Sequence, residues 1–60
     1  MLKEVLEAAL TKEQKEAGLY LEEEPDVLFL LKDDRRVAIF LADMATVAEI
    51  RKEADKYVKS

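Results

Sequence analysis

The segment 2–17 repeats its apolar positions at the spacing of an amphipathic helix. These positions fall on one stripe of a period of about 3.6 residues: Leu2, Val5, Leu6, Ala9 and Leu10. Gly18 follows, and glycine commonly ends a helix in the left-handed conformation. Thr11 with Gln14 three positions later is also the pattern of a capping box, which would begin a fresh helix there. We expect one helix from about residue 2 to residue 17, with a break near Thr11 as the alternative.

The middle of the chain changes to the pattern of β-strands. Residues 19–22 alternate apolar with amphipathic or polar side chains, and continuous apolar runs follow at 27–31 and 37–41. Pro25 separates the first two of these segments, because proline lacks the N–H that a central strand needs. The polar tip 33–36 between the two runs predicts a β-hairpin. Since this tip contains no glycine, we expect a longer loop built on a type I turn rather than a two-residue turn.

The last segment returns to a helical period, and its start is clearly marked. Thr46 with Glu49 three positions later is a capping box. The apolar stripe behind it contains Val47, Ile50, Ala54, Tyr57 and Val58. The element order is therefore α-β-β-β-α, which predicts a single α+β domain over residues 1–60. We expect a small antiparallel three-stranded meander with both helices packed on one face.

Composition limits both the stabilisation and the chemistry of this chain. The 60 residues include no cysteine and no histidine, which removes disulfides, thiol nucleophiles and the commonest general base and metal ligand. We therefore expect no enzymatic activity and no cofactor. So short a chain buries only about 60% of its unfolded surface, so regular packing or oligomerisation must compensate. Charged residues form 40% of the chain, a composition typical of thermophile proteins and of idealised designs.

Net charge and hydropathy bear on the choice of partner. The net charge of −4 opposes attraction to nucleic acid, which needs a positive surface to displace counterions. Two acids precede Arg35 and Arg36 in the hairpin tip, and the basic residues of the last helix are interleaved with acids. No apolar run approaches the roughly 20 residues that cross a bilayer. We expect a cytoplasmic protein that does not bind membranes, and the net charge disfavours nucleic acid as a partner.

The acidic residues around Pro25 are a candidate metal site. Four carboxylates gather around the proline, and carboxylate oxygens are ligands for hard cations: Glu22, Glu23, Glu24 and Asp26. The cluster lacks the spacing of a calcium loop and the glycine on which such a loop bends. A nuclease-like arrangement of Asp26 with Lys32 lacks its second carboxylate, because Leu30 stands at that position. We interpret the cluster as a solvated strand end and turn, with no metal bound.

Strand alternation predicts an interaction surface. With a loop of two or four residues, Leu28 and Leu30 share the helix-covered face with Val37, Ile39 and Leu41. The opposite face then carries the predicted interface: Tyr20, Val27, Phe29, Leu31, Ala38 and Phe40. A loop of three residues would swap the partners within the hairpin. A sheet with one helix on each face is the alternative that buries both sets within a monomer.

These observations favour a non-catalytic interaction protein. We expect a small acidic homodimer that binds, inhibits or adapts another protein through protein–protein contacts. An apolar surface larger than two helices can cover supports this hypothesis. The alternatives are a nucleic-acid-binding regulator that uses the hairpin or the last helix, and a structural or designed scaffold without a partner.

Overall fold

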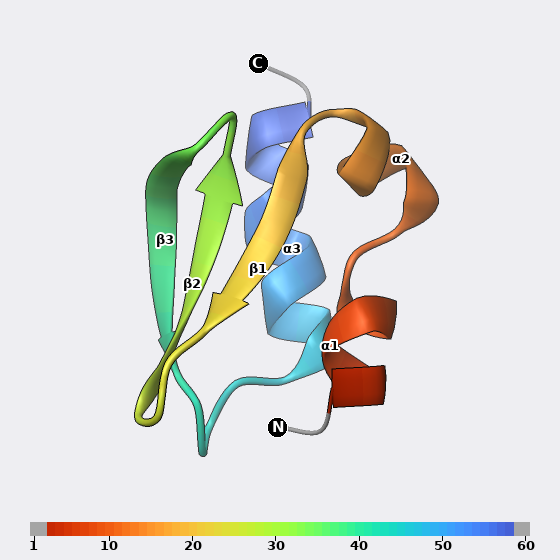
Figure 1. Ribbon diagram of the computed structural model, residues 1–60. Helices are drawn as coiled ribbons and strands as arrows, with labels where there is room; N and C mark the ends of the chain where they lie inside the picture. Colours follow the sequence, from red (N-terminus) through yellow and green to blue (C-terminus); the bar gives the residue numbers. More distant parts are fainter. Residues whose placement is uncertain (1–2, 59–60) are drawn as a thin grey trace.

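A computed structural model describes residues 3–58 of the chain, without the side chains of residues 3, 4 and 7. The element order confirms the predicted α-β-β-β-α arrangement and the α+β class (Figure 1). The elements are α1 (Lys3–Ala9), α2 (Lys12–Glu16), β1 (Leu19–Glu23), β2 (Val27–Lys32), β3 (Arg35–Leu41) and α3 (Val47–Val58). Leu2, the first residue of the predicted apolar stripe, lies outside the described residues.

The expected single helix over 2–17 is wrong, because the chain breaks between α1 and α2. Thr11 is extended (φ −73°, ψ 163°) and caps α2. Its Oγ1 accepts a hydrogen bond from the Gln14 N–H at 3.1 Å, and Gln14 Oε1 accepts one from the Thr11 N–H at 2.9 Å. This reciprocal pair is the capping box that the sequence offered as the alternative. The box satisfies two N–H groups at the start of α2 and makes the break a defined turn.

Helix α3 begins where the sequence predicted, with the Thr46 half of the expected capping box. The Thr46 Oγ1 accepts a hydrogen bond from the Glu49 N–H at 3.2 Å, directly before the helix begins at Val47. Ile50 and Ala54 on the predicted apolar stripe are fully buried. The cap therefore fixes where α3 begins, and the stripe fixes which side faces the core.

The three strands form one antiparallel sheet in the order β1-β2-β3. The loop between β2 and β3 consists of Asp33 and Asp34 alone, so the expectation of a longer loop is wrong. Both aspartates have positive φ, 51° and 69°, as the two central residues of a type I′ turn require. Aspartate tolerates this conformation better than most residues, which explains how a two-residue turn forms without glycine. The Asp33 N–H also donates to Gly18 O at 3.2 Å, which ties the turn to the start of β1.

A β-bulge at Val37 changes which side chains of β3 face the helices. Leu31 pairs with Arg36, whereas Leu30 pairs with Ala38, so Val37 is the extra residue. Because strand side chains alternate, every residue after the bulge turns to the face opposite the one predicted. Ala38 and Phe40 consequently pack against the core. The prediction that Ala38 and Phe40 lie on the uncovered face is therefore wrong.

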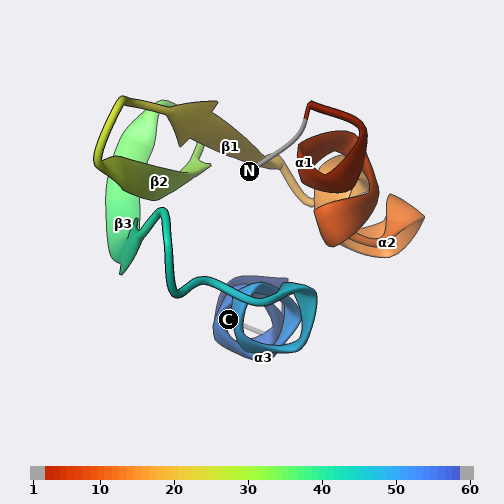
Figure 2. The same cartoon turned by 90° about the horizontal axis from the view of Figure 1, so that it is seen from below.

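The core lies between the sheet and the helices. Its buried members are Ala9, Leu10, Leu19, Leu28, Leu30, Ile50 and Ala54. Figure 2 shows α3 facing one side of the sheet, with α1 and α2 beside the β1 edge. Arg51 of α3 joins these parts, since its guanidinium donates to Ala8 O at 2.9 Å and to Ala9 O at 3.0 Å. Only α3 therefore covers a face of the sheet, whereas α1 and α2 flank the β1 edge and pack against α3, and the alternative with one helix on each face is not what forms.

Candidate interaction surface

The face of the sheet turned away from α3 carries most of the large exposed apolar side chains. We call it the outer face, and the strand register gives its members as Tyr20, Glu22, Val27, Phe29, Leu31, Arg36, Ile39 and Leu41. Ile39 and Leu41 are each 60% exposed and Tyr20 is 42% exposed. Val27 and Phe29 are half-buried, although no described helix covers them. Apolar side chains from all three strands therefore lie on the same face of the sheet.

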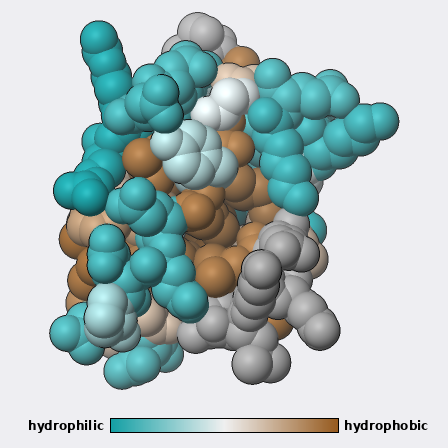
Figure 3. Space-filling model, in the orientation of Figure 1, coloured by the Kyte–Doolittle hydropathy of each residue, from teal (hydrophilic) through white to brown (hydrophobic). Residues whose placement is uncertain are grey.

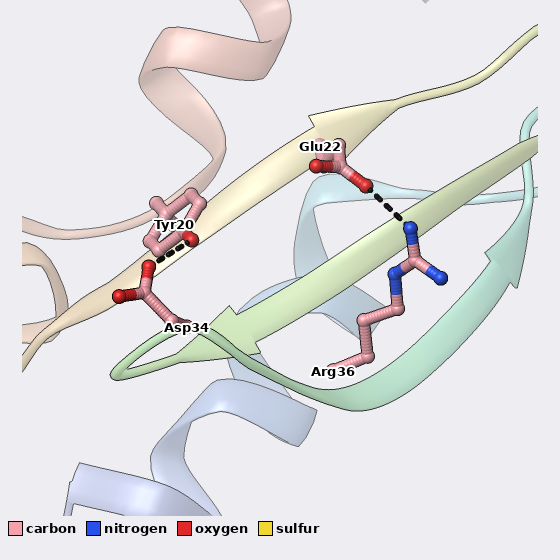
Figure 4. A network of polar contacts seen from close by, with 4 residues as sticks. All are labelled: Tyr20, Glu22, Asp34 and Arg36. Carbon is pink, nitrogen blue, oxygen red and sulfur yellow. Dashed lines mark hydrogen bonds and ion pairs between the residues drawn. The ribbon is translucent and has the colours of Figure 1, made fainter.

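Arg36 spans the middle of the outer face. Its Nη2 lies 3.1 Å from Glu22 Oε1, and its guanidinium carbon lies 4.3 Å from the centre of the Phe29 ring. Figure 4 shows the Arg36 side chain reaching from β3 across β2 to Glu22 on β1. The arginine thus shields one side of Phe29 while keeping its charge in water. As an exposed ion pair, the contact with Glu22 adds little to stability.

Tyr20 closes the end of the outer face that lies near the hairpin loop. Its hydroxyl donates a hydrogen bond to Asp34 Oδ1 at 2.8 Å (Figure 4). This hydrogen bond to Asp34 raises the pKa of the Tyr20 hydroxyl above its ordinary value of 10.0, and desolvation and the nearby carboxylates act in the same direction. The contact ties β1 to the loop, so the Tyr20 ring is held over the sheet.

Leu31 lies on the outer face but is only 5% exposed. Its cross-strand neighbours are Tyr20 on β1 and Arg36 on β3, so large side chains flank it on both sides. Neighbours on one sheet face cover each other in this way when they are long or aromatic. Leu31 consequently belongs to the predicted face but offers almost no surface to a partner.

The register brings together only part of the predicted interface. Tyr20, Val27, Phe29 and Leu31 lie on the outer face, while Ala38 and Phe40 face the helices. Sequence reasoning missed Ile39 and Leu41, the two most exposed apolar side chains of the sheet. The β-bulge puts Ile39 and Leu41 on the outer face in place of Ala38 and Phe40. No distinctive residue in the sequence marks this bulge, since Arg36, Val37 and Ala38 are all ordinary strand residues.

The acidic cluster at the end of β1 does not converge. Glu22 lies on the outer face in contact with Arg36, and Glu23 points to the other side of the strand. Glu24 and Asp26 belong to the turn, where the Glu24 N–H donates to Val27 O at 2.9 Å and Asp26 O accepts from the Ala42 N–H at 3.1 Å. Within residues 3–58, no three acidic side chains gather closely enough to hold a metal ion.

Several basic side chains of the hairpin and α3 already have partners within the molecule. Arg36 contacts Glu22 and Phe29, and Arg51 donates to the carbonyls at the end of α1. Lys56 forms an ion pair with Glu53 at 3.1 Å. A phosphate backbone would have to compete with these contacts, which weakens the case for a nucleic-acid surface.

Comparison with protein-family models, curated proteins and solved structures found no match for this chain. None of the helices that the structure describes has the length and apolar character needed to span a membrane. Evidence on function therefore comes from the residues of the outer face and from their arrangement.

Proposed function

We propose that this chain is a non-catalytic protein-interaction domain that forms a homodimer through its outer face. The supporting observation is the exposure of Ile39 and Leu41 next to Val27 and Phe29, on a sheet face without a helix. A chain of 60 residues has little apolar surface to spare, so leaving this much in water weakens an already small core. Contact with a partner would remove this surface from water.

The arrangement of apolar and charged residues favours a second copy as the partner. Cross-strand pairs place Val27 beside Leu41 and Phe29 beside Ile39, which makes a compact apolar patch. Glu22 and Arg36 carry opposite charges and border this patch on one side, where the Arg36 guanidinium lies over the Phe29 ring. A twofold axis near Ile39 and Leu41 would lay apolar patch on apolar patch and keep both charges at that border of the contact, where they can pair within or between copies.

The dimensions of the molecule predict a weak dimer. The Cα atoms span 28 × 19 × 15 Å, so a contact confined to one sheet face is at the small end of specific interfaces. We therefore expect the mass to rise with concentration. An adaptor or inhibitor role would then require a further partner, and the composition-based expectations of cytoplasmic location and thermostability stay predictions.

Sedimentation equilibrium over a range of concentrations tests this proposal. We expect a mass approaching two chains at about 100 μM and a fall toward one chain on dilution. Ile39→Glu should give a folded monomer throughout, because it places a charge in the centre of the proposed contact. Met44→Glu is the matched control, since Met44 is an exposed apolar residue outside the strands at 69% exposure. A parent protein with the mass of one chain at this concentration would contradict the proposal.

A further inference from the structure

Two of the hollows on the described surface are mainly apolar. The larger, of about 340 Å³, lies between α1, α2 and β1 and forms the brown recess near the middle of Figure 3. Helices stand beside it, which keeps a broad partner surface away (Figure 2). The other is a shallow hollow of about 280 Å³ on the outer face, where no described helix stands. The shallow hollow is therefore the one that a second folded copy can reach.

The shallow hollow lies at the β-bulge of β3, and we call it the bulge hollow. Its lining is Phe29, Arg36, Val37, Ala38 and Ile39. Arg36 and Ile39 are successive outer-face residues of β3, and the bulge leaves two residues between them instead of one. The Arg36 side chain also extends away across β2 toward Glu22 (Figure 4). The place on β3 between Arg36 and Ile39 is therefore left open.

Two exposed apolar side chains follow the bulge hollow on the same strand. Ile39 and Leu41 are each 60% exposed, and both lie on the outer face. Outer-face side chains two residues apart are about 7 Å from each other along the strand, which leaves a space between them. From the bulge onward, β3 thus presents a hollow, Ile39, a space and Leu41, each about one residue further along.

We infer that the outer faces of two copies interdigitate, with Leu41 of each copy seated in the bulge hollow of the other. This inference rests on the proposed homodimer and gives it a defined geometry. A twofold axis that crosses β3 between the levels of Ile39 and Leu41 sets the two β3 strands antiparallel across the interface. The same axis places Ile39 of each copy in the space between Ile39 and Leu41 of the other.

The order of hollow and side chains on β3 fits a reversed copy of itself. Reversal brings Leu41 over the hollow and Ile39 over the space, so each side chain meets an opening and no two collide. Val27 and Phe29 on β2 pair with Leu41 and Ile39, so they repeat the same spacing beside β3. A head-to-tail contact would leave one hollow and one Leu41 unused and would continue into a filament, whereas the twofold arrangement closes.

The position of Arg36 fits the same arrangement. Its side-chain stem forms one wall of the bulge hollow, while its guanidinium lies toward β1 in contact with Glu22. An arginine stem offers apolar surface while its charge stays in water, so Leu41 of the partner packs against the stem. The ion pair with Glu22 can stay within each copy, and no charge has to be buried unpaired.

Sedimentation equilibrium of two truncation variants tests the role of Leu41. Leu41→Ala leaves the hollow empty on both sides of the dimer, and association should weaken by about tenfold or more. Val5→Ala is the control, because Val5 is an exposed apolar residue on α1, away from the outer face. Its dissociation constant should stay within about twofold of the parent value. Equal dissociation constants for the two variants would overturn the inference, and thermal unfolding shows that both remain folded.

Nuclear magnetic resonance detects the contacts between copies directly. In a mixture of isotope-labelled and unlabelled full-length chains at a concentration where dimers form, isotope-filtered nuclear Overhauser effects arise between copies alone. We expect effects from the Leu41 methyl groups to the Ile39 methyl groups and to the Arg36 methylenes. We expect none between the two Leu41 residues. An effect between the two Leu41 residues would mean that the β3 strands lie parallel, and would overturn the inference.

Single cysteines test the position of the axis, because the chain has no cysteine of its own. Ile39→Cys places the two thiols about one residue apart along β3, whereas Leu41→Cys separates them by about 10 Å along the strand. Mild oxidation should therefore link Ile39→Cys copies much faster than Leu41→Cys copies. Faster linking through Leu41→Cys, or equal rates, would overturn the inference. A parent with the mass of one chain would overturn the homodimer as well, whereas a dimer without these contacts would overturn the interdigitation alone.

Discussion

Gln14 and Asp55 are joined by a hydrogen bond of 2.8 Å between the Gln14 Nε2 and the Asp55 Oδ1, across α2 and α3. The same Nε2 donates to Arg51 O at 3.1 Å, and the Gln14 Oε1 accepts from the Thr11 N–H. Gln14 is 2% exposed, the one buried polar side chain in the described part of the chain, and each of its polar atoms has a partner. The Gln14 side chain therefore both caps α2 and joins α2 to α3 through hydrogen bonds.

Replacing Gln14 with alanine should therefore cost more than a typical helix substitution. The change leaves the Thr11 N–H unpaired and removes both bonds to α3, so we expect a loss of about 2 kcal/mol in the free energy of unfolding. Glu13→Ala, on the exposed side of the same helix, should stay within about 0.5 kcal/mol of the parent. Urea unfolding followed by circular dichroism measures both. Equal midpoints for the two variants would mean that the Gln14 contacts contribute little.

The bulge predicts opposite outcomes for two neighbouring substitutions in β3. Ile39→Glu places a carboxylate on the outer face, where the native side chain is 60% exposed, and should leave the fold intact. Phe40→Glu places it against the core, and we expect a loss of about 3 kcal/mol or more. In so small a domain that loss threatens folding altogether. Thermal unfolding of both variants tests the register directly. A folded Phe40→Glu protein beside an unfolded Ile39→Glu protein would show that the phase of β3 is the reverse.

Gly18 should be intolerant of a side chain for two separable reasons. Its φ is +95°, which L-residues rarely adopt, and an added Cβ would lie 2.5 Å from Asp33 Oδ1. We expect Gly18→Ala to cost about 1–2 kcal/mol from the backbone conformation, with the contact adding to this. In an Asp33→Gly background the contact is gone, so the same substitution should cost less. A double-mutant cycle by urea unfolding measures the difference, and strictly additive effects would exclude the contact.

The bond between Tyr20 and Asp34 predicts a dependence on alkaline pH. The pKa of Tyr20 is raised above 10.0 chiefly by this hydrogen bond, so folding favours the protonated hydroxyl. The corresponding stability is complete below the unfolded value near 10.0 and is lost as pH rises through the folded pKa. Asp34→Asn removes the carboxylate and should bring the Tyr20 pKa back toward 10.0.

Ultraviolet absorbance of the phenolate during a pH titration measures this change. Tyr57→Phe in both backgrounds leaves Tyr20 as the only titrating tyrosine, so the signal is assigned without ambiguity. Asparagine tolerates the positive φ at position 34, which keeps the turn comparable between the two proteins. The prediction fails if the two titration curves coincide.

Local signals in the sequence were sufficient for the order of the strands and the last helix, but not for the break between α1 and α2 or for the register of β3. The Thr46 cap gave the start of α3 because the Thr–Glu pair lies within one turn of helix. The Thr11 signal was equally local, but preference for a break over a continuous helix depends on contacts of Gln14 with α3, 37 and 41 residues away. Such distant contacts leave no trace in the periodicity of the segment.

The outer face was predicted correctly on β1 and β2 and wrongly on β3. The pairing between β1 and β2 is regular, so simple alternation of side chains was sufficient to place Tyr20, Val27 and Phe29 on this face. The face of Ala38 and Phe40 was predicted by counting residues from the hairpin loop. That count is wrong by one, because Val37 is an extra residue in β3. The use of this face as a dimer interface stays a prediction.

Val37 shows that the pairing of β3 matters as much as its residue types. If Val37 paired with Leu30 instead of being the extra residue, alternation would turn Phe40 outward and Ile39 inward without a change in any side chain. Deleting Val37 would instead make the ladder regular and keep Phe40 opposite Leu28 and Ile39 opposite Phe29. In any alignment of relatives, a one-residue gap at Val37 should therefore be interpreted as loss of the bulge with the outer face unchanged.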